Sequence, residues 1–392
     1  MVVWIVNPFD NLPLEGYRPQ RYWLMARAFV RAGHTVTVWT SDFSHALKAK
    51  RILRKAPPPE PDGTIRTEEG CRGVLIGAPP YRRNISLTRV RSHRILAKRW
   101  LARAASEPPP DVTIASSPPL SLCAAVRRFC ADRRLPFVID VMDAWPENFE
   151  RVVPRWILTP LRRAARANSR GATAITVVAE RYAELVKAYG ATAPVGLFHH
   201  GIERDEPLPR AADPPSGLTL AYVGNMGKSY DLETVIEAVK SMADVRLELA
   251  GAGPDEARLR ERAGTCERIR FRGQLDGEAL RAMLAACDAG VVPMFADACV
   301  GIPYKLADYA AAGLPVLNTL QGEAEKLIAA CGAGITYRTG SPEAFRAAVE
   351  QLKRADRARM TDGARKLAER FDAQTIYPAF VSFVEANAGK RR

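Results

Sequence analysis

The sequence predicts an α/β protein built from two doubly wound domains, and three observations carry this prediction. Short runs of β-branched and apolar residues alternate with longer segments whose apolar residues recur every three to four positions. This alternation occurs twice along the 392 residues. Residues 201–217, rich in proline and glycine, separate the two series and suit neither a helix nor a strand. Strands that alternate with helices form parallel sheets covered by helices on both faces.

The first series predicts an N-terminal domain over residues 1–200. Its strands are expected at residues 2–6, 35–40, 74–76, 112–115, 137–141 and 174–178, and its helices include residues 22–32 and 120–131. Residues 55–62 contain three consecutive prolines, which favour an extended, exposed loop.

The second series predicts a C-terminal domain over residues 218–372, joined to the first by the linker 201–217. Its strands are expected at residues 219–223, 246–250, 268–271, 289–292, 315–318 and 334–337. Its helices are expected at residues 231–241, 255–263, 276–286, 305–312, 323–330 and 342–352. Residues 373–386 predict an amphipathic helix, and we expect the segment 373–392 to return to the N-terminal domain.

Net charge separates the two halves of the chain. The total is +14, from 57 basic and 43 acidic side chains. Residues 1–205 hold 32 basic and 18 acidic side chains, whereas the remaining residues hold 25 of each. Only the first half is therefore expected to meet an acidic partner, such as nucleic acid, an anionic membrane or an anionic substrate.

The cysteines and the apolar segments set the expected compartment. The seven cysteines are scattered and include no C-x-x-C pair, which argues against a zinc site and favours a reducing compartment. The N-terminus lacks the basic and apolar regions of a secretory signal, and no segment has the 18 apolar residues of a spanning helix. We expect a cytoplasmic protein whose membrane contact, where it has one, lies at the surface of the inner face of the plasma membrane.

Residues that follow the predicted strands are the candidates for ligand binding. Ligands bind beyond the carboxyl ends of parallel strands, and with two domains the natural site is the cleft between them. The turn over residues 224–231 joins a strand to a helix, so bare N–H groups, the helix dipole and Lys228 suit a phosphate or diphosphate. A tight turn with a solvated lysine is the alternative. Gly251 and Gly253 also follow a strand, where a sterically required turn is the simpler explanation.

Residues 300–315 predict a loop that leads into a helix and then into the next strand. Asp308 lies near the start of that helix, where its carboxylate can accept hydrogen bonds from the vicinal hydroxyls of a ribose. Favourable interaction with the helix dipole is the alternative, which needs no ligand. Lys305 lies three residues earlier and can face the same pocket.

The ordered motifs of the second half resemble those of the retaining GT-B glycosyltransferases of family 4. The matches are the glycine-rich turn GNMGKSYD, the segment GAGPDEARL, the segment FRGQLDGEAL, the strand CDAGVVPM and the segment DYAAAGLPVLN, in this order over about 100 residues. In the first half, RPQRYWLMARAFVRAGHTVTVWT resembles the family's first helix and second strand. SSPP at 116–119 and DAWPE at 143–147 resemble a subgroup that often builds bacterial surface polysaccharides, such as the amino-sugar transferases of O-antigen synthesis.

The resemblance implies a GT-B architecture, in which the two domains face each other across a cleft, with a donor site in the second domain. Asp308 matches the second Glu of the family's Glu-x7-Glu motif, which binds the nucleotide ribose, and Gln274 and Leu275 match the edge that meets the base. Gly301 and Ile302 match backbone donors near the diphosphate and the sugar. The remaining donor-binding residues that we expect come from the glycine turns and the loop–helix: Gly224, Asn225, Met226, Gly227, Gly251, Gly253, Tyr304 and Lys305.

Several positions depart from the family pattern. Val300 replaces the first Glu of Glu-x7-Glu and cannot bind a sugar hydroxyl, and Pro303 replaces a residue whose N–H could donate. The usual Arg and Lys of the phosphate turn fall on Asn225 and Tyr230, so Lys228 with Lys305 is the expected replacement cation. Met142-Asp143 occupies the place of a His-Asp pair, of which only the carboxylate remains.

The acceptor site is expected in the first domain. Asp143 and Glu147 can orient or deprotonate an acceptor hydroxyl, with helix capping as the alternative for Glu147. Arg18 and Arg21 can grip an acceptor phosphate, with surface or salt-bridged arginines as the alternative. Glu15, Gly16 and Ser117 complete the expected acceptor-binding set.

The expected mechanism needs little acid–base machinery. Departure of a nucleoside diphosphate is promoted by cations and helix N-termini, so we assign Lys228 and Asp143 as catalytic. No metal or further cofactor is expected, because the chain has no D-x-D signature. A UDP-sugar is the favoured donor, and GDP-, ADP- and dTDP-sugars stay open.

The positive charge is concentrated between Glu69 and Glu107, which enclose nine basic and no acidic residues. Residues 82–103 predict a basic amphipathic helix that carries Trp100 on an apolar arc, a pattern that suits an anionic membrane surface. An ordinary domain helix with a solvated basic face is the alternative.

Three functions compete at this point. The leading hypothesis is transfer of a sugar from a nucleotide donor to a lipid-linked or membrane-proximal acceptor in bacterial surface polysaccharide or glycolipid synthesis. The second keeps the reaction but uses a soluble small-molecule acceptor. The third is a nucleic-acid-binding protein, which only the charge favours, since no recognition module is present.

Overall fold

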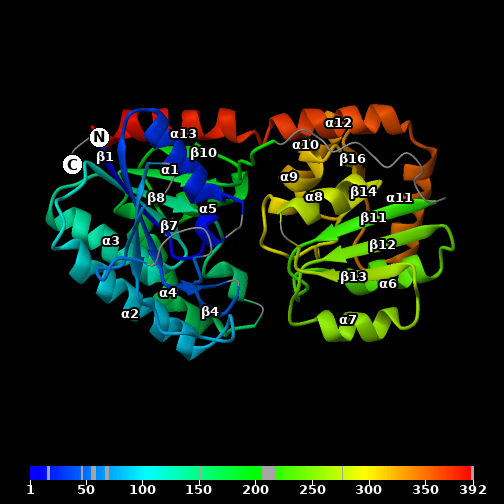
Figure 1. Ribbon diagram of the computed structural model, residues 1–392, viewed down its shortest axis with the longest axis horizontal. Coiled ribbons are helices and arrows are strands. Elements are labelled where there is room, and N and C mark those ends of the chain that lie inside the picture. The colour runs from blue at the N-terminus through cyan, green and yellow to red at the C-terminus, as the bar shows by residue number, and fades with distance from the viewer. Residues whose placement is uncertain are drawn as a thin grey trace. The chain divides into compact units, whose positions relative to one another are not determined.

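The computed structural model describes residues 1–15, 18–45, 47–53, 59–66, 70–150, 152–204, 217–275 and 277–389. The chain forms two compact units (Figure 1), the first made of residues 1–201 with 373–392 and the second of residues 202–372. Most of the expected linker, residues 205–216, lies outside the described residues, as does Gly16. The sequence correctly predicts the fold class, because each unit contains a parallel sheet covered by helices.

The first unit is built on an eight-stranded sheet with the order β10-β9-β8-β7-β1-β2-β6-β5. Its strands are β1 (Val2–Val6), β2 (Thr35–Ser41), β5 (Thr64–Arg66), β6 (Arg72–Ile76), β7 (Val112–Ser117), β8 (Phe137–Val141), β9 (Ala174–Val177) and β10 (Val195–Leu197). All neighbours are parallel except β5, which pairs antiparallel with β6. The short strands β3 (Phe43–Ser44) and β4 (Ala49–Lys50) form a separate hairpin. The two edge strands β5 and β10 and this hairpin are absent from the sequence-based prediction, because segments of two or three residues show no clear period.

The helices of the first unit cover both faces of its sheet. They are α1 (Arg21–Arg31), α2 (Leu87–Ala104), α3 (Leu120–Asp132), α4 (Arg155–Arg170), α5 (Glu180–Ala188) and α13 (Ala373–Ala388), with short 3-10 turns η1 (Pro13–Glu15) and η2 (Glu147–Phe149). α13 packs against α1, and both share one core with β1 and β2. On the opposite face α2 packs against α3, and α3 packs against α4.

Alternation along β1 supplies both of these cores. Val3 and Ile5 belong to the core beneath α1 and α13. Trp4 lies between them in sequence and therefore points to the other face, where its ring centre lies 4.9 Å from that of Trp39 and 6.5 Å from that of Trp100. This aromatic cluster holds α2 against the sheet.

The second unit is built on a six-stranded parallel sheet with the order β13-β12-β11-β14-β15-β16. Its strands are β11 (Leu218–Val223), β12 (Val245–Ala250), β13 (Ile269–Gly273), β14 (Ala289–Val292), β15 (Val316–Asn318) and β16 (Gly334–Thr336). Its helices are α6 (Leu232–Lys240), α7 (Glu256–Ala263), α8 (Gly277–Ala285), α9 (Tyr304–Ala311), α10 (Glu323–Cys331), α11 (Pro342–Arg354) and α12 (Arg357–Glu369). Every strand expected here has a counterpart in the sheet, so the carboxyl ends of six parallel strands meet at one edge.

No helix in the described part of the chain is both long and apolar enough to cross a lipid bilayer.

Candidate functional site

The glycine-rich turns after β11 and β12 lie in direct backbone contact. Gly224 and Gly251 adopt φ values of +128° and +126°, which residues other than glycine rarely adopt. A Cβ atom on Gly251 would lie 1.9 Å from the carbonyl oxygen of Gly224, and one on Gly253 would lie 2.2 Å from the carbonyl oxygen of Met226. These four residues, predicted from the sequence as donor-binding, are therefore adjacent, and glycine is required for the close approach of the two turns.

The N-terminus of α6 differs from the expectation of an open phosphate site. The carboxylate of Asp231 caps the helix by accepting a hydrogen bond from the N–H of Thr234, and it accepts two more from Thr339 and from the N–H of Gly340. The N–H groups of Gly224 and Met226 donate to carbonyls of the neighbouring turn. The prediction that this turn offers a helix N-terminus to phosphate is wrong, because a carboxylate of the chain already lies there.

α9 instead brings a cation beneath the glycine turn. Lys305 is 5% exposed, and a Cβ on Gly224 would lie 3.3 Å from its Nζ. The Nζ lies 3.9 Å from the ring centre of Tyr222 and 3.7 Å from that of Tyr230. Among the described residues this Nζ has no hydrogen-bond partner. Two tyrosine faces can hold an ammonium group through cation–π attraction, but they leave its three N–H donors unused.

Burial controls the protonation of Lys305. Removal from water lowers its pKa well below the usual value, and the nearby carboxylate of Asp308 only partly opposes this effect. Asp308 is also buried, at 7% exposure, one helical turn further along α9. The N-cap residue of α9 is Pro303, which has no side-chain group that could cap the helix. An anion at this position would therefore meet a lysine and the positive end of the helix dipole.

Tyr309 fixes α9 against the sheet. Its hydroxyl accepts a hydrogen bond from the N–H of Val223 and donates one to the carbonyl of Val291. A Cβ on Gly290 would lie 2.2 Å from the ring of Tyr309, so glycine is needed where this ring crosses β14. The helix that carries Lys305 and Asp308 is therefore held at a fixed depth behind the glycine turns.

The remaining residues expected to bind the donor differ in exposure. Asn225, Lys228 and Gln274 are exposed, and Leu275 is half-buried. The N–H of Gly251 donates to the carbonyl of Gly273, so the segment that carries Gln274 and Leu275 adjoins the second glycine turn. The loop before and at the start of α9 supplies Gly301, Ile302 and Tyr304. Within the described residues, no contact assigns Lys228 a specific partner.

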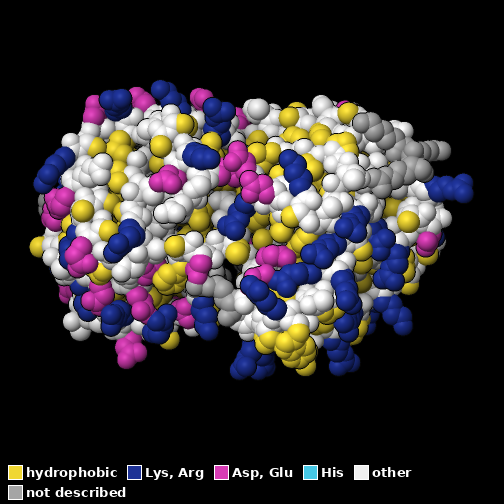
Figure 2. Space-filling view, turned by 180° about the vertical axis from the view of Figure 1, so that it is seen from behind, with side chains coloured by type: hydrophobic (Ala, Val, Ile, Leu, Met, Phe, Trp, Pro, Cys, Tyr) yellow, Lys and Arg dark blue, Asp and Glu magenta, His cyan; other side chains and the backbone are white. Residues whose placement is uncertain are grey.

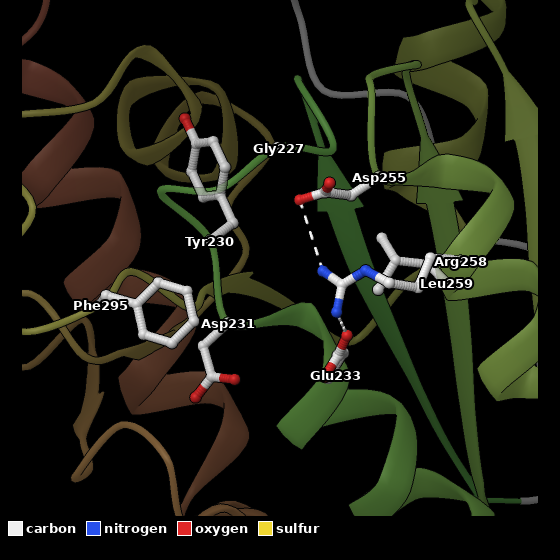
Figure 3. A pocket seen from close by; sticks show the side chains of 8 residues that line it. All are labelled: Gly227, Tyr230, Asp231, Glu233, Asp255, Arg258, Leu259 and Phe295. Atoms are coloured by element: carbon white, nitrogen blue, oxygen red, sulfur yellow. Dashed lines mark ion pairs between the residues drawn. The ribbon is translucent and has the colours of Figure 1, made fainter. Parts of the chain in front are cut away.

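A small cavity of about 80 Å³ lies beside the first glycine turn, between Gly227 and Tyr230. Figure 3 shows the guanidinium of Arg258 turned towards the carboxylates of Asp255 and Glu233, and it shows the Tyr230 ring across the cavity from them. Pockets for small molecules measure roughly 300–1,000 Å³, so this cavity alone cannot hold a nucleotide.

In the first unit, Asp143 and Glu147 follow β8 and lie in different surroundings. Asp143 is half-buried, and its carboxylate accepts hydrogen bonds from the N–H of Ala144 and from Asn148. Burial is the main cause that raises its pKa, and these hydrogen bonds oppose the rise. Glu147 accepts hydrogen bonds from Tyr189 and from Arg162, which anchor η2 to the helices that follow. The Glu147 carboxylate therefore holds η2 against its neighbours. The alternative prediction, that Glu147 caps a helix, is wrong, because the residue before η2 is Pro146 and Glu147 lies inside this turn.

Arg21 has a structural role in place of the expected phosphate contact. It is fully buried, and its guanidinium donates to both carboxylate oxygens of Asp140 at 2.8 and 2.9 Å. Its remaining Nη1 donates to the carbonyls of Phe198 and His199. A guanidinium with these four partners has no surface left for a ligand, so the salt-bridged alternative is the correct one.

Glu15 and Ser117 are likewise buried, whereas Arg18 is exposed. The Glu15 carboxylate accepts from the N–H of Leu12 and from Arg51, at 2.8 and 2.6 Å, and so closes the loop after β1. The backbone carbonyl of Ser117 accepts from the N–H of Met142, which ties the ends of β7 and β8 together. Gly16, also expected in this set, lies outside the described residues.

Two family descriptions match the chain along most of its length. "Glycosyl transferase 4-like domain" matches residues 19–197, and "Glycosyl transferases group 1" matches residues 217–354. The chain is a GT-B glycosyltransferase of family 4. The first match falls in the first unit and the second match in the unit that carries the glycine turns.

Solved structures agree with this fold for the glycosyltransferase. Sucrose-phosphate synthase from Thermosynechococcus elongatus is similar with a TM-score of 0.77 and 15% identity, covering 98% of each chain. Anabaena HepE in complex with UDP-glucose is similar with a TM-score of 0.70 and 15% identity, covering 98% of this chain and 100% of the other. WaaG, a glycosyltransferase involved in lipopolysaccharide biosynthesis, is similar with a TM-score of 0.66 and 16% identity, covering 97% of this chain and 99% of the other. No curated protein sequence matches the chain significantly.

The outer face of α2 in this glycosyltransferase combines basic and apolar side chains. Trp100, expected on the membrane-facing arc, is 1% exposed and belongs to the aromatic cluster of the core, so this part of the prediction is wrong. Leu87 and Val90 are exposed instead, at 87% and 40%. Together with the basic residues of the same face they border a shallow groove of about 450 Å³, lined by Leu87, Val90, Arg91, Arg94, Ile95 and Lys98.

The start of α4 adds a second exposed apolar segment that the sequence reasoning missed. Trp156 is 76% exposed and Ile157 41% exposed, and they precede the arginine-rich face of the helix. Figure 2 shows Lys and Arg side chains crowded over one face of the first unit, on the right, with a patch of hydrophobic side chains at its lower edge. The adjacent Trp-Ile pair after Pro154 is the signal in the sequence that could have revealed this segment.

Proposed function

We propose that the chain transfers a sugar from a nucleoside diphosphate sugar to a hydroxyl acceptor, with retention of the anomeric configuration. The observation that carries this proposal is Lys305, a buried amine without a hydrogen-bond partner among the described residues, beneath the paired glycine turns. Asp308 lies on the same helix, where its carboxylate suits the vicinal hydroxyls of a ribose. A diphosphate linked to a ribose matches a cation and a carboxylate at this spacing.

In the proposed reaction, the chain stabilises the charge that develops on the departing diphosphate. Lys305 and the start of α9 supply fixed positive charge in a site withdrawn from water, where such charge has its largest effect. Lys228, which is exposed, adds a mobile cation. The acceptor hydroxyl attacks from the face that the diphosphate leaves, and its proton passes to the leaving phosphate oxygen. This scheme needs no metal ion, and Asp143 serves to orient the acceptor hydroxyl.

The favoured donor is a UDP-sugar, because the similar structure of HepE contains UDP-glucose. A thermal-shift series with UDP, GDP, ADP and dTDP tests this assignment, since a ligand stabilises the state that binds it. We expect one diphosphate to raise the melting temperature of the wild-type chain and not that of Asp308→Ala. The absence of a response to all four nucleotides would contradict the proposal.

Retention and metal independence are tested on the purified reaction. We expect the NMR spectrum of the first-formed product to contain the anomer of the donor, and we expect turnover to persist in excess EDTA. An inverted product would rule out same-face attack, and loss of turnover that Mg²⁺ restores would assign the phosphate charge to a metal ion.

The proposed acceptor is held at an anionic membrane, in bacterial surface polysaccharide or glycolipid synthesis. This is supported by the outer face of α2, where exposed leucine and valine alternate with arginine and lysine, and by the exposed Trp156. Apolar side chains that enter the headgroup region, combined with basic neighbours, suit anionic lipids.

Vesicle co-sedimentation at low salt distinguishes this from a soluble acceptor. We expect binding to vesicles that contain an anionic lipid and weak binding to neutral ones. Replacement of an apolar contact, Leu87→Glu, should reduce binding about 10-fold or more, because burial of one leucine contributes about 1.5–3 kcal/mol. Lack of binding to anionic vesicles would favour the soluble acceptor, and salt-dependent DNA binding without any nucleotide response would favour the nucleic-acid alternative.

A further inference from the structure

A second buried cation lies in the first unit, far along the sequence from the donor-binding residues. Arg89 is on the inward face of α2 and is 7% exposed. Its Nη1 donates to the carbonyl of Asn84 at 2.8 Å, whereas its Nε has no partner among the described residues. The guanidinium carbon lies 4.6 Å from the ring centre of Trp145 and 5.7 Å from that of Tyr81. It makes no ion pair within the described part of the chain.

Three further basic side chains surround Arg89. His93, one turn along α2, is 7% exposed, and its Nε2 also lacks a partner in the described part of the chain. The Nδ1 of His45 lies 2.5 Å from the Tyr81 hydroxyl and 3.2 Å from the Nζ of Lys48. Lys48 adopts a φ of +56°, which residues other than glycine rarely do. We call Arg89, His93, His45 and Lys48 the basic cluster.

The basic cluster lies at the carboxyl edge of the sheet, where parallel α/β folds bind ligands. Phe9, whose ring centre is 5.0 Å from that of His45, follows β1. His45 follows β3, the hairpin strand that comes directly after β2, whereas Tyr81 follows β6 and Trp145 follows β8. Phe9, His45, Lys48 and Trp145, which surround Arg89, are half-buried, so part of this surrounding is accessible to solvent.

Within the described residues, no carboxylate forms an ion pair with Arg89, Lys48, His45 or His93. Burial and the neighbouring Arg89 lower the pKa of His45 and of His93 to about 3, and they lower the pKa of Lys48 to about 8. The acidic groups that act on Arg89 are the Tyr81 hydroxyl and Asp143, and burial raises the pKa of both. A buried guanidinium without a carboxylate partner carries a large desolvation cost, which a bound anion would offset.

We propose that the basic cluster binds a phosphate group of the acceptor. Arg89 offers the unused side of a planar fork that fits two phosphate oxygens, and Lys48 offers a compact ammonium. A phosphate monoester carries nearly two negative charges and matches the two cations of the cluster, Arg89 and Lys48, better than a carboxylate does. The term acceptor rests on the proposed glycosyl transfer, but the phosphate site itself does not.

Continuity with the outer face of α2 places this phosphate near a membrane surface. Leu87 and Val90 flank Arg89 along the helix and face the solvent. A membrane that contacts these two side chains would therefore lie within one helical turn of Arg89 along α2. The phosphate is therefore that of a lipid-linked acceptor or that of a soluble sugar phosphate, and the two share the same recognition chemistry.

Titration with glycerol 3-phosphate, followed by calorimetry on the full chain, tests the site. We expect Arg89→Met to weaken binding about 10-fold or more and Arg89→Lys, which keeps the charge but loses the fork, to weaken it less. Lys240→Met, on the exposed end of α6 in the other unit, is the matched control and should leave the affinity unchanged, whereas Lys305→Met reports any binding at the proposed donor site instead. No binding by the wild type, or a loss caused by Lys305→Met and not by either Arg89 variant, would overturn the proposal.

The pH dependence of the same titration supplies an independent readout. Phosphate raises the pKa of Lys48, which is about 8 in the free chain, so binding takes up a proton above pH 8. Glycerol 3-phosphate is already a dianion there, because its second pKa is about 6. The affinity should fall about 10-fold from pH 7 to pH 9 in the wild type and stay level in Lys48→Met. An equal decline in both proteins would remove Lys48 from the site.

Vesicles separate the two sources of the phosphate. We expect vesicles of neutral lipid with a polyprenyl phosphate to bind the wild type more tightly than neutral vesicles alone, and we expect Arg89→Met to lose this difference. Competition by millimolar glycerol 3-phosphate should release the chain. If Arg89→Met binds these vesicles like the wild type but no longer binds glycerol 3-phosphate, the acceptor is a soluble phosphate. If the variant keeps both vesicle binding and glycerol 3-phosphate binding, the phosphate site is overturned.

The test also distinguishes failure of this site from failure of the proposed glycosyl transfer. Nucleoside diphosphate binding is measured on the same Arg89 and Lys305 variants. A chain that binds glycerol 3-phosphate through Arg89 but no nucleotide would keep the phosphate site and lose the proposed donor. A chain that binds nucleotide but no glycerol 3-phosphate would keep the proposed donor and lose the phosphate site.

Discussion

Three buried cations of this glycosyltransferase differ in what surrounds them. Arg21 donates to both oxygens of Asp140 and to two carbonyls. Lys305 in the second unit and Arg89 in the first lie over aromatic rings, and each has a nitrogen without a partner among the described residues. A fully paired cation stabilises the fold, whereas an unpaired one is costly until a ligand arrives. The comparison therefore separates a structural cation from two candidates for binding anions.

The largest expected effect is on stability. Arg21→Met leaves the buried carboxylate of Asp140 uncompensated and should destabilise the first unit by about 3–5 kcal/mol. Arg89→Met removes a buried charge that has no carboxylate partner, so its melting temperature should stay equal to that of the wild type or rise. Thermal unfolding of both variants checks this, and an equal loss in the two would remove the distinction between paired and unpaired cations.

The next effect concerns the donor. Asp308→Ala should lower the affinity for the nucleoside diphosphate roughly 10- to 100-fold, because a charge-assisted hydrogen bond contributes about 1.5–3 kcal/mol. Asp308→Glu keeps the carboxylate and should retain most of the affinity. Calorimetric titration measures both variants. Unchanged affinity of Asp308→Ala would exclude the ribose contact.

The pH dependence of donor binding sharpens the role of Lys305. Burial lowers the pKa of its amine, and a bound diphosphate should raise it again. Binding then takes up a proton, so the affinity should decline as the pH rises above the pKa of the free amine. Lys305→Met should bind the diphosphate more weakly at neutral pH and lose this decline. Calorimetry in buffers of different ionisation enthalpy measures the proton uptake, and uptake that persists in the variant would assign it elsewhere.

The smallest effect is expected at Lys228. Its side chain is exposed, so solvent screens its interaction with phosphate. Lys228→Ala should lower kcat only about 3- to 10-fold, with a small change in nucleotide affinity. Steady-state kinetics check this, with Lys240→Ala on the exposed end of α6 as the matched control. A loss as large as that of Lys305→Met would reverse the order of the two lysines.

Much of the fold could be predicted because it depends on local patterns. The strand–helix alternation, the break near residue 201 and the glycines at positive φ in the turns are written in short stretches of sequence. The two glycine turns that we propose to bind the donor are adjacent in the structure because the carboxyl ends of parallel strands meet at one edge. The sequence-based prediction does not include the helices α4, α5 and α12. It also does not identify Asp231 as the cap of α6, because the carboxylate of Asp231 is fixed by Thr339 and Gly340, which lie more than 100 residues away.

The sequence by itself determined the two parallel-sheet domains, the family and the order of the donor motifs. Only the tertiary structure decided that Arg21 pairs with Asp140, that Trp100 lies in the core and that Arg89 faces inward. A helix wheel shows which residues share a face, but it does not show which face meets the sheet. That choice depends on contacts between segments far apart in the chain, which the order of strands in the sheet brings together.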